Sequence, residues 1–381
     1  VDVSRLSPNP KVRLLAKMEG QNPGGSVKDR IARQMILEAE ADGTLYPGAT
    51  LIEPSSGNTG IALAMICQER GYHIKILLPE SVSIERRQML EVFGAEIMLT
   101  PGGEGSNGAV RRAIDLAAEN PDWVFLYQYG NEANPRAHYE TTGPEIWADA
   151  PEITHFVAGL GTSGTLLGVG TYLKERNPDV SILAVEPPSG ELVEGLRSLE
   201  DGYIPPVFEK WGGYELLDGK SIVRPRESLE YTRKLAGIGI FAGISSGASV
   251  AAALKIAERA PIGSTILCML PDTGERYLST ILFEDIPADM TPDEKAISRS
   301  TPLAQFDGPA PVAPVAPATA APVDAEARQF IAQAIADPAN PVVLFALEWC
   351  EFCWSVRKML GHYKIPFRSV DLDSVAYQQD D

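Results

Sequence analysis

The chain has 381 residues, of which 44% are hydrophobic and 22% are charged, and these values are close to the averages of globular proteins. The length suits two folded units and a tail, and the composition excludes a collagen-like repeat, a coiled coil and wholesale disorder. With 51 acidic and 33 basic residues the formal net charge is −18. This charge disfavours partners such as nucleic acid or an anionic membrane surface.

The chain offers no targeting or membrane-spanning segment. No apolar run reaches the roughly 18 residues that a membrane span needs, and residues 1–11 lack the features of a signal peptide. We therefore expect a cytoplasmic protein. Of four cysteines, Cys67 and Cys268 lie in apolar runs and are expected to be packing residues, whereas Cys350 and Cys353 form a C-x-x-C motif.

From residue 11 to about residue 282, short apolar runs alternate with segments of helical periodicity. This alternation predicts an α/β fold with a largely parallel sheet. One amphipathic helix is expected at 31–40, where the apolar residues share a face. The expected strands are 12–17, 50–53, 74–78, 96–99, 124–126, 155–158, 181–186 and 265–270.

The composition changes after this region. Residues 308–323 are rich in proline and alanine without periodicity, which indicates a semi-extended linker. A second unit follows, for which we expect a helix, a strand, the C-x-x-C motif, a helix and a strand, at 325–336, 341–347, 350–353, 354–363 and 367–371. The predicted domains are 1–295 and 324–381, with 296–323 as the linker.

Three loops share one design, in which small residues follow an extended segment and begin a helix. Such loops present free backbone N–H groups and the positive helix end to anions. In the first, residues 22–30, Ser26 is the expected N-cap and Lys28 lies in the first helical turn. The helix field lowers the pKa of an amine there, which favours a neutral nucleophile toward an aldehyde. The alternative is an exposed lysine paired with Asp29.

The second loop, residues 55–60, suits a carboxylate or a phosphate, and Asn58 adds an amide. The third, residues 159–165, matches G-x-G-x-x-G, and Glu186 follows Gly164 by 22 residues. One interpretation is therefore a nicotinamide-dependent oxidoreductase. The other is a phosphate-monoester site, because three hydroxyl residues lie in the loop.

Together, a candidate Schiff-base lysine, a carboxylate loop and a phosphate loop indicate pyridoxal 5′-phosphate acting on an amino acid. The sequence also resembles the cysteine synthase family of fold-type II pyridoxal-phosphate enzymes over nearly all of residues 11–283. The segments that carry this resemblance are 22–30, 56–60, 161–165, 243–247 and 275–280. Three more segments are most similar to the cysteine synthase B branch: 85–88, 127–129 and 142–147.

The resemblance implies two parallel-sheet, three-layer α/β subdomains, a homodimer and a set of site residues. Lys28 would bind the cofactor covalently and Asn58 would hold its ring hydroxyl. Thr273 would face the pyridine nitrogen, with Asp272 as the competing residue. The cofactor phosphate would be held by Gly161, Thr162, Ser163, Gly164 and Thr165. The substrate would be held by Ser56, Gly57, Thr59, Gln128 and Gly243.

The C-terminal unit is similar to glutaredoxin, a thioredoxin-like fold, with Cys350 as the attacking thiol and Cys353 as the resolving thiol. The resemblance implies only a partial domain, because the cis-proline loop of that family would lie beyond Asp381. Glutathione is then a possible partner. Zinc is the alternative for this motif, but no second Cys or His pair lies near it, so no metal site is predicted.

The family also opens with a strand and an I-G-N-T-P-L segment, and neither precedes Val12, so we expect the chain to lack its native N-terminus. The implied activity is β-replacement on an activated serine, either O-acetylserine or O-phosphoserine, with sulfide or thiosulfate as the sulfur donor. A cystathionine β-synthase and a silent binding module remain alternatives. Lys220, Arg224 and Arg226 are candidates to favour the phosphorylated substrate, or they are solvated surface residues.

The fusion suggests a coupled reaction. Thiosulfate would leave S-sulfocysteine, whose S–S bond a thiolate can reduce through a mixed disulfide. The linker of 16 residues would reach up to roughly 50 Å at about 3.1 Å per residue. Tethering would raise the effective concentration of the redox unit. The alternative is a fusion of two activities without coupling.

Overall fold

The computed structural model describes residues 1–55, 57–287, 289–299, 325–336, 338–346 and 351–371. It divides into two compact units, residues 1–288 and 289–381, which we describe separately. The domain boundaries at 295 and 323 remain predictions. Among the described residues, no helix is both long and apolar enough to cross a membrane.

The first unit contains two parallel sheets. The strand order is β1-β9-β6-β7-β8 in the five-stranded sheet and β4-β3-β2-β5 in the four-stranded sheet. The five-stranded sheet consists of β1 (Arg13–Met18), β6 (His155–Gly159), β7 (Ser181–Glu186), β8 (Gly219–Ile222) and β9 (Thr265–Leu270). The four-stranded sheet consists of β2 (Thr50–Pro54), β3 (His73–Pro79), β4 (Glu96–Thr100) and β5 (Trp123–Phe125).

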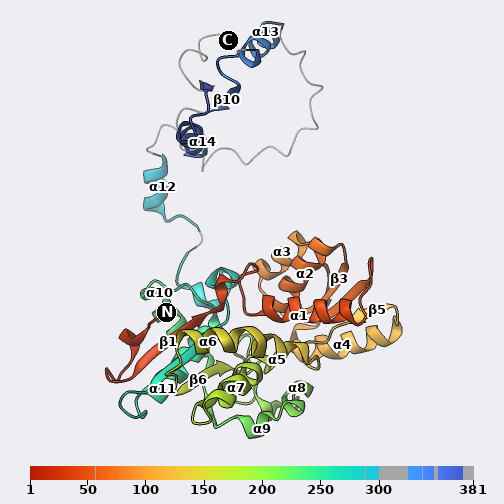
Figure 1. Cartoon of the computed structure of the whole chain (residues 1–381), viewed down its shortest axis with the longest axis vertical. Helices are drawn as coiled ribbons and strands as arrows, with labels where there is room; N and C mark the ends of the chain where they lie inside the picture. Colours follow the sequence, from red (N-terminus) through yellow and green to blue (C-terminus); the bar gives the residue numbers. More distant parts are fainter. Residues whose placement is uncertain (56, 288, 300–324, 337, 347–350, 372–381) are drawn as a thin grey trace. The chain divides into compact units, whose positions relative to one another are not determined.

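Each sheet is the centre of a lobe, and we call these the five-stranded and the four-stranded lobe. Figure 1 shows that β1, although first in the sequence, lies with β6 and α11 in the five-stranded lobe. The helices of the first unit are α1 (Lys28–Ala41), α2 (Asn58–Arg70), α3 (Ile84–Val92), α4 (Gly105–Glu119), α5 (Ala133–Ala137), the π-helix η4 (His138–Thr142), α6 (Gly143–Asp149), α7 (Gly164–Arg176), α8 (Pro206–Lys210), α9 (Gly213–Leu216), α10 (Pro225–Gly237) and α11 (Ile244–Ala257). Six 3₁₀ turns connect them: η1 (Ser4–Leu6), η2 (Glu19–Gln21), η3 (Gly102–Glu104), η5 (Leu199–Asp201), η6 (Gly274–Tyr277) and η7 (Ile281–Phe283).

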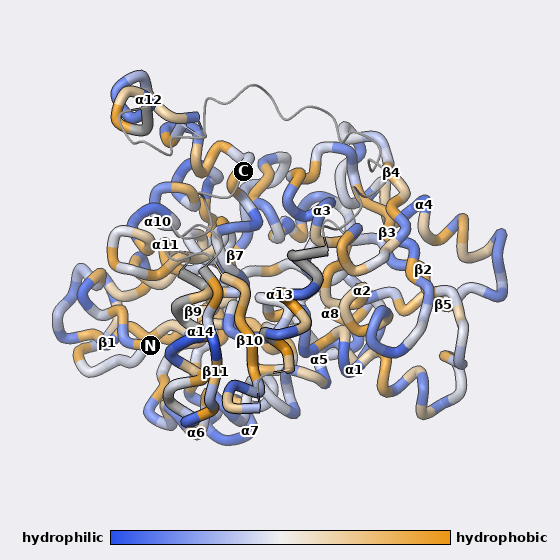
Figure 2. The backbone as a smooth tube through the Cα atoms, turned by 90° about the horizontal axis from the view of Figure 1, so that it is seen from above, coloured by the Kyte–Doolittle hydropathy of each residue, from blue (hydrophilic) through white to orange (hydrophobic). Residues whose placement is uncertain are grey.

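Helices cover both faces of each sheet. In the five-stranded lobe, α10 and α11 pack on one face, and α6 and α7 pack on the other. In the four-stranded lobe, α1 and α2 share one core with the sheet, and α4 covers the opposite face. Figure 2 shows hydrophobic segments along β3 and β4, and alternating hydrophilic and hydrophobic segments along α4. The expected pair of three-layer α/β subdomains is therefore confirmed.

All eight predicted strands are present. Strands of a parallel sheet are buried on both faces, so they read as continuous apolar runs; every residue of β9 is buried. The ninth strand, β8, was missed because it is a four-residue edge strand with two exposed positions and no apolar run.

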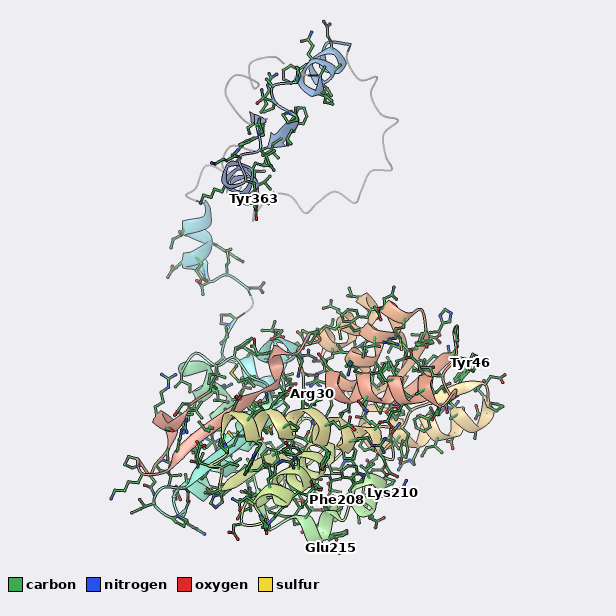
Figure 3. The ribbon with its side chains drawn as sticks, viewed as in Figure 1. Arg30, Tyr46, Phe208, Lys210, Glu215 and Tyr363 are labelled. Carbon is green, nitrogen blue, oxygen red and sulfur yellow. The ribbon has the colours of Figure 1, made fainter. Side chains whose placement is uncertain are left out.

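An ionic network joins the two lobes. Arg30, labelled in Figure 3, donates from its Nε to Glu19 at 2.6 Å and from its Nη2 to Glu145 at 2.7 Å. Glu19 is 1% exposed, and Lys17 also pairs with Glu145 at 2.6 Å. The network thereby fixes the start of α1 against α6.

The second unit contains α12 (Pro292–Arg299), α13 (Ala325–Ile335), β10 (Val342–Ala346), α14 (Glu351–His362) and β11 (Phe367–Asp371). The strands β10 and β11 pair in parallel. The predicted helix, strand, helix and strand of this unit are therefore present. The expected linker at 308–323 lies outside the described residues.

Candidate active site

A cavity of about 260 Å³ lies between the two lobes. It is lined by residues that follow the carboxyl ends of β2, β3, β6 and β7, which is where open α/β sheets bind ligands. The volume is just below the ~300 Å³ lower limit that is usual for small-molecule sites. Seven predicted site residues line it: Lys28, Gly57, Asn58, Thr59, Gln128, Gly161 and Thr162.

Lys28 is the first residue of α1 and lines the cavity. Desolvation lowers the pKa of its amine to about 8, and the negative charge of Asp272 opposes this shift. The predicted direction is thus correct, with burial as its largest cause. The expected N-cap is displaced by one residue, because Val27 occupies that position. Ser26 Oγ still accepts the Lys28 N–H at 3.2 Å.

The second loop precedes α2 and faces a polar partner from another segment. Thr59 Oγ1 donates to Gln128 Oε1 at 2.7 Å, and both residues are buried. Ser55 Oγ accepts the backbone N–H groups of Gly57 at 3.2 Å and Gly60 at 2.9 Å. The first turn of α2 therefore lines the cavity. The free N–H groups of a helix start stabilise a carboxylate bound there. Ser56 lies outside the described residues.

Buried Glu53 holds the Gln128 segment. It accepts backbone N–H groups from Tyr127 at 2.8 Å and from Gln128 at 2.9 Å. Tyr127 has φ 53°, a left-handed conformation that non-glycine residues seldom adopt. Burial raises the pKa of Glu53 to about 8, although these two hydrogen bonds oppose the shift.

Two buried charged residues fix the amide of Asn58. Its Nδ2 donates to Asp272 at 2.6 Å, and its Oδ1 accepts from Arg276 Nη1 at 2.7 Å. Asp272 is 3% exposed and Arg276 is 1% exposed. Tyr277 also donates to Asp272 at 2.6 Å. These two contacts determine the flip state of the amide.

The third loop leads from β6 to α7. Ser163 has φ 68° and precedes Gly164, the first residue of α7, so the first N–H groups of a 13-residue helix are presented together. A Cβ on Gly164 would lie 1.8 Å from Asn134 Oδ1, so only glycine fits there. Thr162 Oγ1 accepts from Asn134 Nδ2 at 2.9 Å.

Five predicted residues are not in the described lining: Ser163, Gly164, Thr165, Thr273 and Gly243. Thr165 Oγ1 bonds His138 Nε2 at 3.2 Å. The Thr273 hydroxyl donates to Glu275, and its role toward the pyridine nitrogen remains a prediction. Gly243 packs against Asp272, where a Cβ would lie 2.0 Å from Oδ1.

The cavity also contains charged residues that sequence reasoning did not assign to the site. Arg86 pairs with Glu194, and both line the cavity. The guanidinium of Arg197 lies 4.8 Å from the ring centroids of Tyr129 and Tyr203. Among the described residues, no carboxylate forms an ion pair with Arg197. The segment 85–88 carried a family resemblance, which was the only signal for Arg86.

The basic cluster of the sequence lies elsewhere. Lys220 pairs with Glu186 at 3.4 Å, and Arg224 pairs with half-buried Glu191 at 2.5 Å. Neither cation is in the described cavity lining. Glu186 is fully buried and accepts the Leu199 N–H at 3.2 Å. It is not among the described residues that line the cavity.

The cysteines divide as expected where they are described. Burial raises the pKa of Cys67 and of Cys268 to about 12, which makes both poor nucleophiles. Cys353 lies in α14 and is partly exposed. Cys350 lies outside the described residues.

These residues fit pyridoxal 5′-phosphate. Lys28 supplies an amine whose pKa allows a neutral fraction near pH 8. The first N–H groups of α7 form a site for an anion. The backbone of Gly195 approaches Gly161 closely at this site, because a Cβ on residue 161 would lie 2.6 Å from Gly195 O. Asn58 supplies an oriented N–H beside Lys28 in the same lining.

Known proteins agree with this geometry. Residues 1–272 match the pyridoxal-phosphate dependent enzyme family, and residues 342–380 match glutaredoxin. Cysteine synthase B of Salmonella typhimurium is 42% identical over 285 residues, covering 74% of this chain and 92% of that protein. O-ureido-L-serine synthase of Streptomyces lavendulae is 42% identical over 296 residues, covering 75% and 90%.

A solved structure of a related enzyme also superposes on this chain. The O-acetylserine dependent cystathionine beta-synthase from Helicobacter pylori superposes with a TM-score of 0.69 at 38% identity, covering 74% of this chain and 94% of that chain. The nicotinamide interpretation is therefore replaced by one in which pyridoxal phosphate is the cofactor. The chain belongs to the pyridoxal-phosphate dependent enzymes, in their cysteine synthase branch of β-replacement enzymes, and carries a glutaredoxin segment behind that domain.

Proposed function

We propose that the first unit makes L-cysteine or S-sulfocysteine from an activated serine and an inorganic sulfur donor. The activated serine is O-acetylserine or O-phosphoserine, and the donor is sulfide or thiosulfate. The observation that carries the proposal is that Lys28, the Thr59–Gln128 pair and two arginines line the same cavity.

The side chains have distinct roles in this proposal. Bound pyridoxal phosphate supplies the electron sink that lets an amino acid lose its Cα proton and its β-substituent. Thr59, Gln128 and the first turn of α2 hold the substrate carboxylate. The Lys28 amine takes the Cα proton, because its lowered pKa leaves a neutral fraction at the working pH.

The cations favour charged reactants. Arg86 and Arg197 both line the cavity, and guanidinium groups bind phosphate and other oxyanions with paired N–H groups. Either a phosphoryl leaving group or thiosulfate is an anion that such groups would bind. O-phosphoserine and thiosulfate are therefore the reactants that the cavity supports best.

The assignment is tested by replacing Lys28. The purified Lys28→Ala protein is expected to lose the visible absorbance of the bound cofactor, and exposed Lys11→Ala is the matched control that keeps it. Turnover is then measured with each activated serine combined with each donor. Retained absorbance in Lys28→Ala would refute the assignment, and failure of all four combinations would refute the substrate class.

The glutaredoxin segment suggests a second step. The Cys350 thiolate would attack the cysteinyl sulfur of S-sulfocysteine, releasing sulfite and forming a mixed disulfide with cysteine. Cys353 would then displace cysteine and form the Cys350–Cys353 disulfide. Two molecules of glutathione would reduce this disulfide and leave as oxidised glutathione. Each step exchanges one S–S bond for another, so electrons balance.

This step is tested with activated serine, thiosulfate and glutathione. The full-length protein is expected to release cysteine faster than Cys350→Ser, with equal S-sulfocysteine formation in both. Equal rates of cysteine release would show that the two units are fused without coupling.

A second candidate has support from one relative. The Helicobacter pylori protein is described as an O-acetylserine dependent cystathionine beta-synthase. An assay with homocysteine in place of the inorganic donor distinguishes this activity. A cytoplasmic location and a homodimer remain predictions.

A further inference from the structure

An ion pair crosses the cavity from one lobe to the other. Arg86 extends from α3 in the four-stranded lobe, and Glu194 lies in the segment after β7 in the five-stranded lobe. Arg86 Nη2 donates to Glu194 Oε2, and both residues line the same cavity as Lys28. The pair therefore lies within the reactive site.

The Arg86 side chain is enclosed on several sides. It is 8% exposed, and its guanidinium carbon lies 4.6 Å from the centroid of the Tyr277 ring. A Cβ on Gly57 would lie 2.7 Å from Arg86 Cδ, so the arginine packs against the loop that begins α2. This packing fixes the guanidinium where a reactant bound on that loop would meet it.

Glu194 is the more accessible partner. Its side chain is 30% exposed, and its segment has no helix or strand. A carboxylate on an arginine occupies the N–H groups that a phosphate, sulfate or thiosulfate oxygen would use. An oxyanion that binds Arg86 must therefore displace Glu194 or share the arginine with it.

We propose that Glu194 is a specificity-determining residue that competes with oxyanionic reactants for Arg86. This inference rests on the proposed function, because it assigns Arg86 to the anion of that same reaction. The shared chemistry is a tetrahedral oxyanion carrying about two charges. Its source is either the phosphoryl group of the activated serine or the thiosulfate donor.

The test uses the full chain loaded with cofactor, so that the cofactor phosphate site is already filled. Glu194→Gln keeps the size of the side chain and a neutral acceptor for Arg86, but removes the competing charge. Glu191→Gln is the matched control, because Glu191 pairs with Arg224 outside the described cavity lining. Binding of thiosulfate and of inorganic phosphate is measured by titration calorimetry without substrate.

Glu194→Gln is expected to bind at least one of these anions about tenfold more tightly, at the lower end of coupling between close charges. Glu191→Gln is expected to match the unmodified protein. The gain is expected to vanish in the double variant Arg86→Gln, Glu194→Gln. Unchanged affinity in Glu194→Gln, or a gain that persists in the double variant, would overturn the proposal.

Two kinetic arms identify the source of the anion. A KM lowered for thiosulfate and not for sulfide assigns Arg86 to the donor. A KM lowered for O-phosphoserine and not for O-acetylserine assigns it to the leaving group. Lys28-dependent visible absorbance is measured in every variant, because its absence from the unmodified protein would refute the proposed function independently of the anion affinities.

Discussion

Lys28 combines a place at the start of a helix with burial, and both disfavour its charged form. Burial lowers the pKa of the amine to about 8, whereas an unperturbed lysine has a pKa of about 10.4. Only the neutral amine attacks an aldehyde. The protein without cofactor therefore already contains a fraction of Lys28 in the neutral form that reacts with the aldehyde.

A pH dependence follows from this pKa. The rate at which the cofactor-free protein takes up pyridoxal phosphate should rise about tenfold per pH unit below the pKa, because the neutral fraction of Lys28 rises, and should level off above it. Stopped-flow absorbance from pH 6 to 10 measures the rate. A rate that still rises tenfold per unit between pH 9 and 10 would contradict the lowered pKa.

Asn58 depends on its charged neighbours. Because Asp272 accepts from Asn58 Nδ2, Asp272→Asn removes a charge-assisted hydrogen bond of about 1.5 to 3 kcal/mol. Cofactor affinity, measured by absorbance titration of the cofactor-free protein, is expected to fall about tenfold or more. Thr273→Val is the competing arm, and a larger loss there would favour Thr273 over Asp272 as the residue that faces the pyridine nitrogen.

The site residues differ in how visible they are in the sequence. Loops such as 159–165 are visible because small residues must follow a strand and begin a helix. The sequence does not show where each side chain of such a loop points. Thr165, for example, bonds His138, and Thr273 bonds Glu275. Arg86 was not assigned to the site because its partner, Glu194, is distant in the sequence.

Elements are easier to predict than side chains. Buried parallel strands such as β9 read as apolar runs from either face. The edge strand β8 lacks such a run. Periodicity also could not assign β1 to the five-stranded sheet. That assignment depends on its pairing with β9, which lies far away in the sequence.

The junction of α1 with α6 depends on one arginine. Arg30→Met leaves Glu19, which is 1% exposed, without its closest cation. Breaking a buried pair on one side is expected to lower the free energy of unfolding by about 3 to 5 kcal/mol. Urea unfolding followed by tryptophan fluorescence measures the loss.

The control for this variant is Arg70→Met. Arg70 pairs with Glu40 at 2.6 Å, but the arginine side chain is 37% exposed. Removing a largely solvated pair is expected to cost less than about 1 kcal/mol. Equal losses in the two variants would show that the network of Arg30 does not stabilise the junction.

At the scale of the whole molecule, the chain combines a β-replacement domain with a glutaredoxin segment. The net charge of −18 contrasts with the cations inside the cavity, Lys28, Arg86 and Arg197. Anionic reactants are repelled by the surface and attracted by the site, so salt should aid their approach and weaken their binding.

The visible spectrum of the full-length protein carrying pyridoxal phosphate tests the proposed β-replacement reaction most directly. We expect a visible band that requires Lys28, changes when O-acetylserine or O-phosphoserine is added, and returns when sulfide or thiosulfate follows. A band that neither activated serine alters, or that persists in Lys28→Ala, would contradict it.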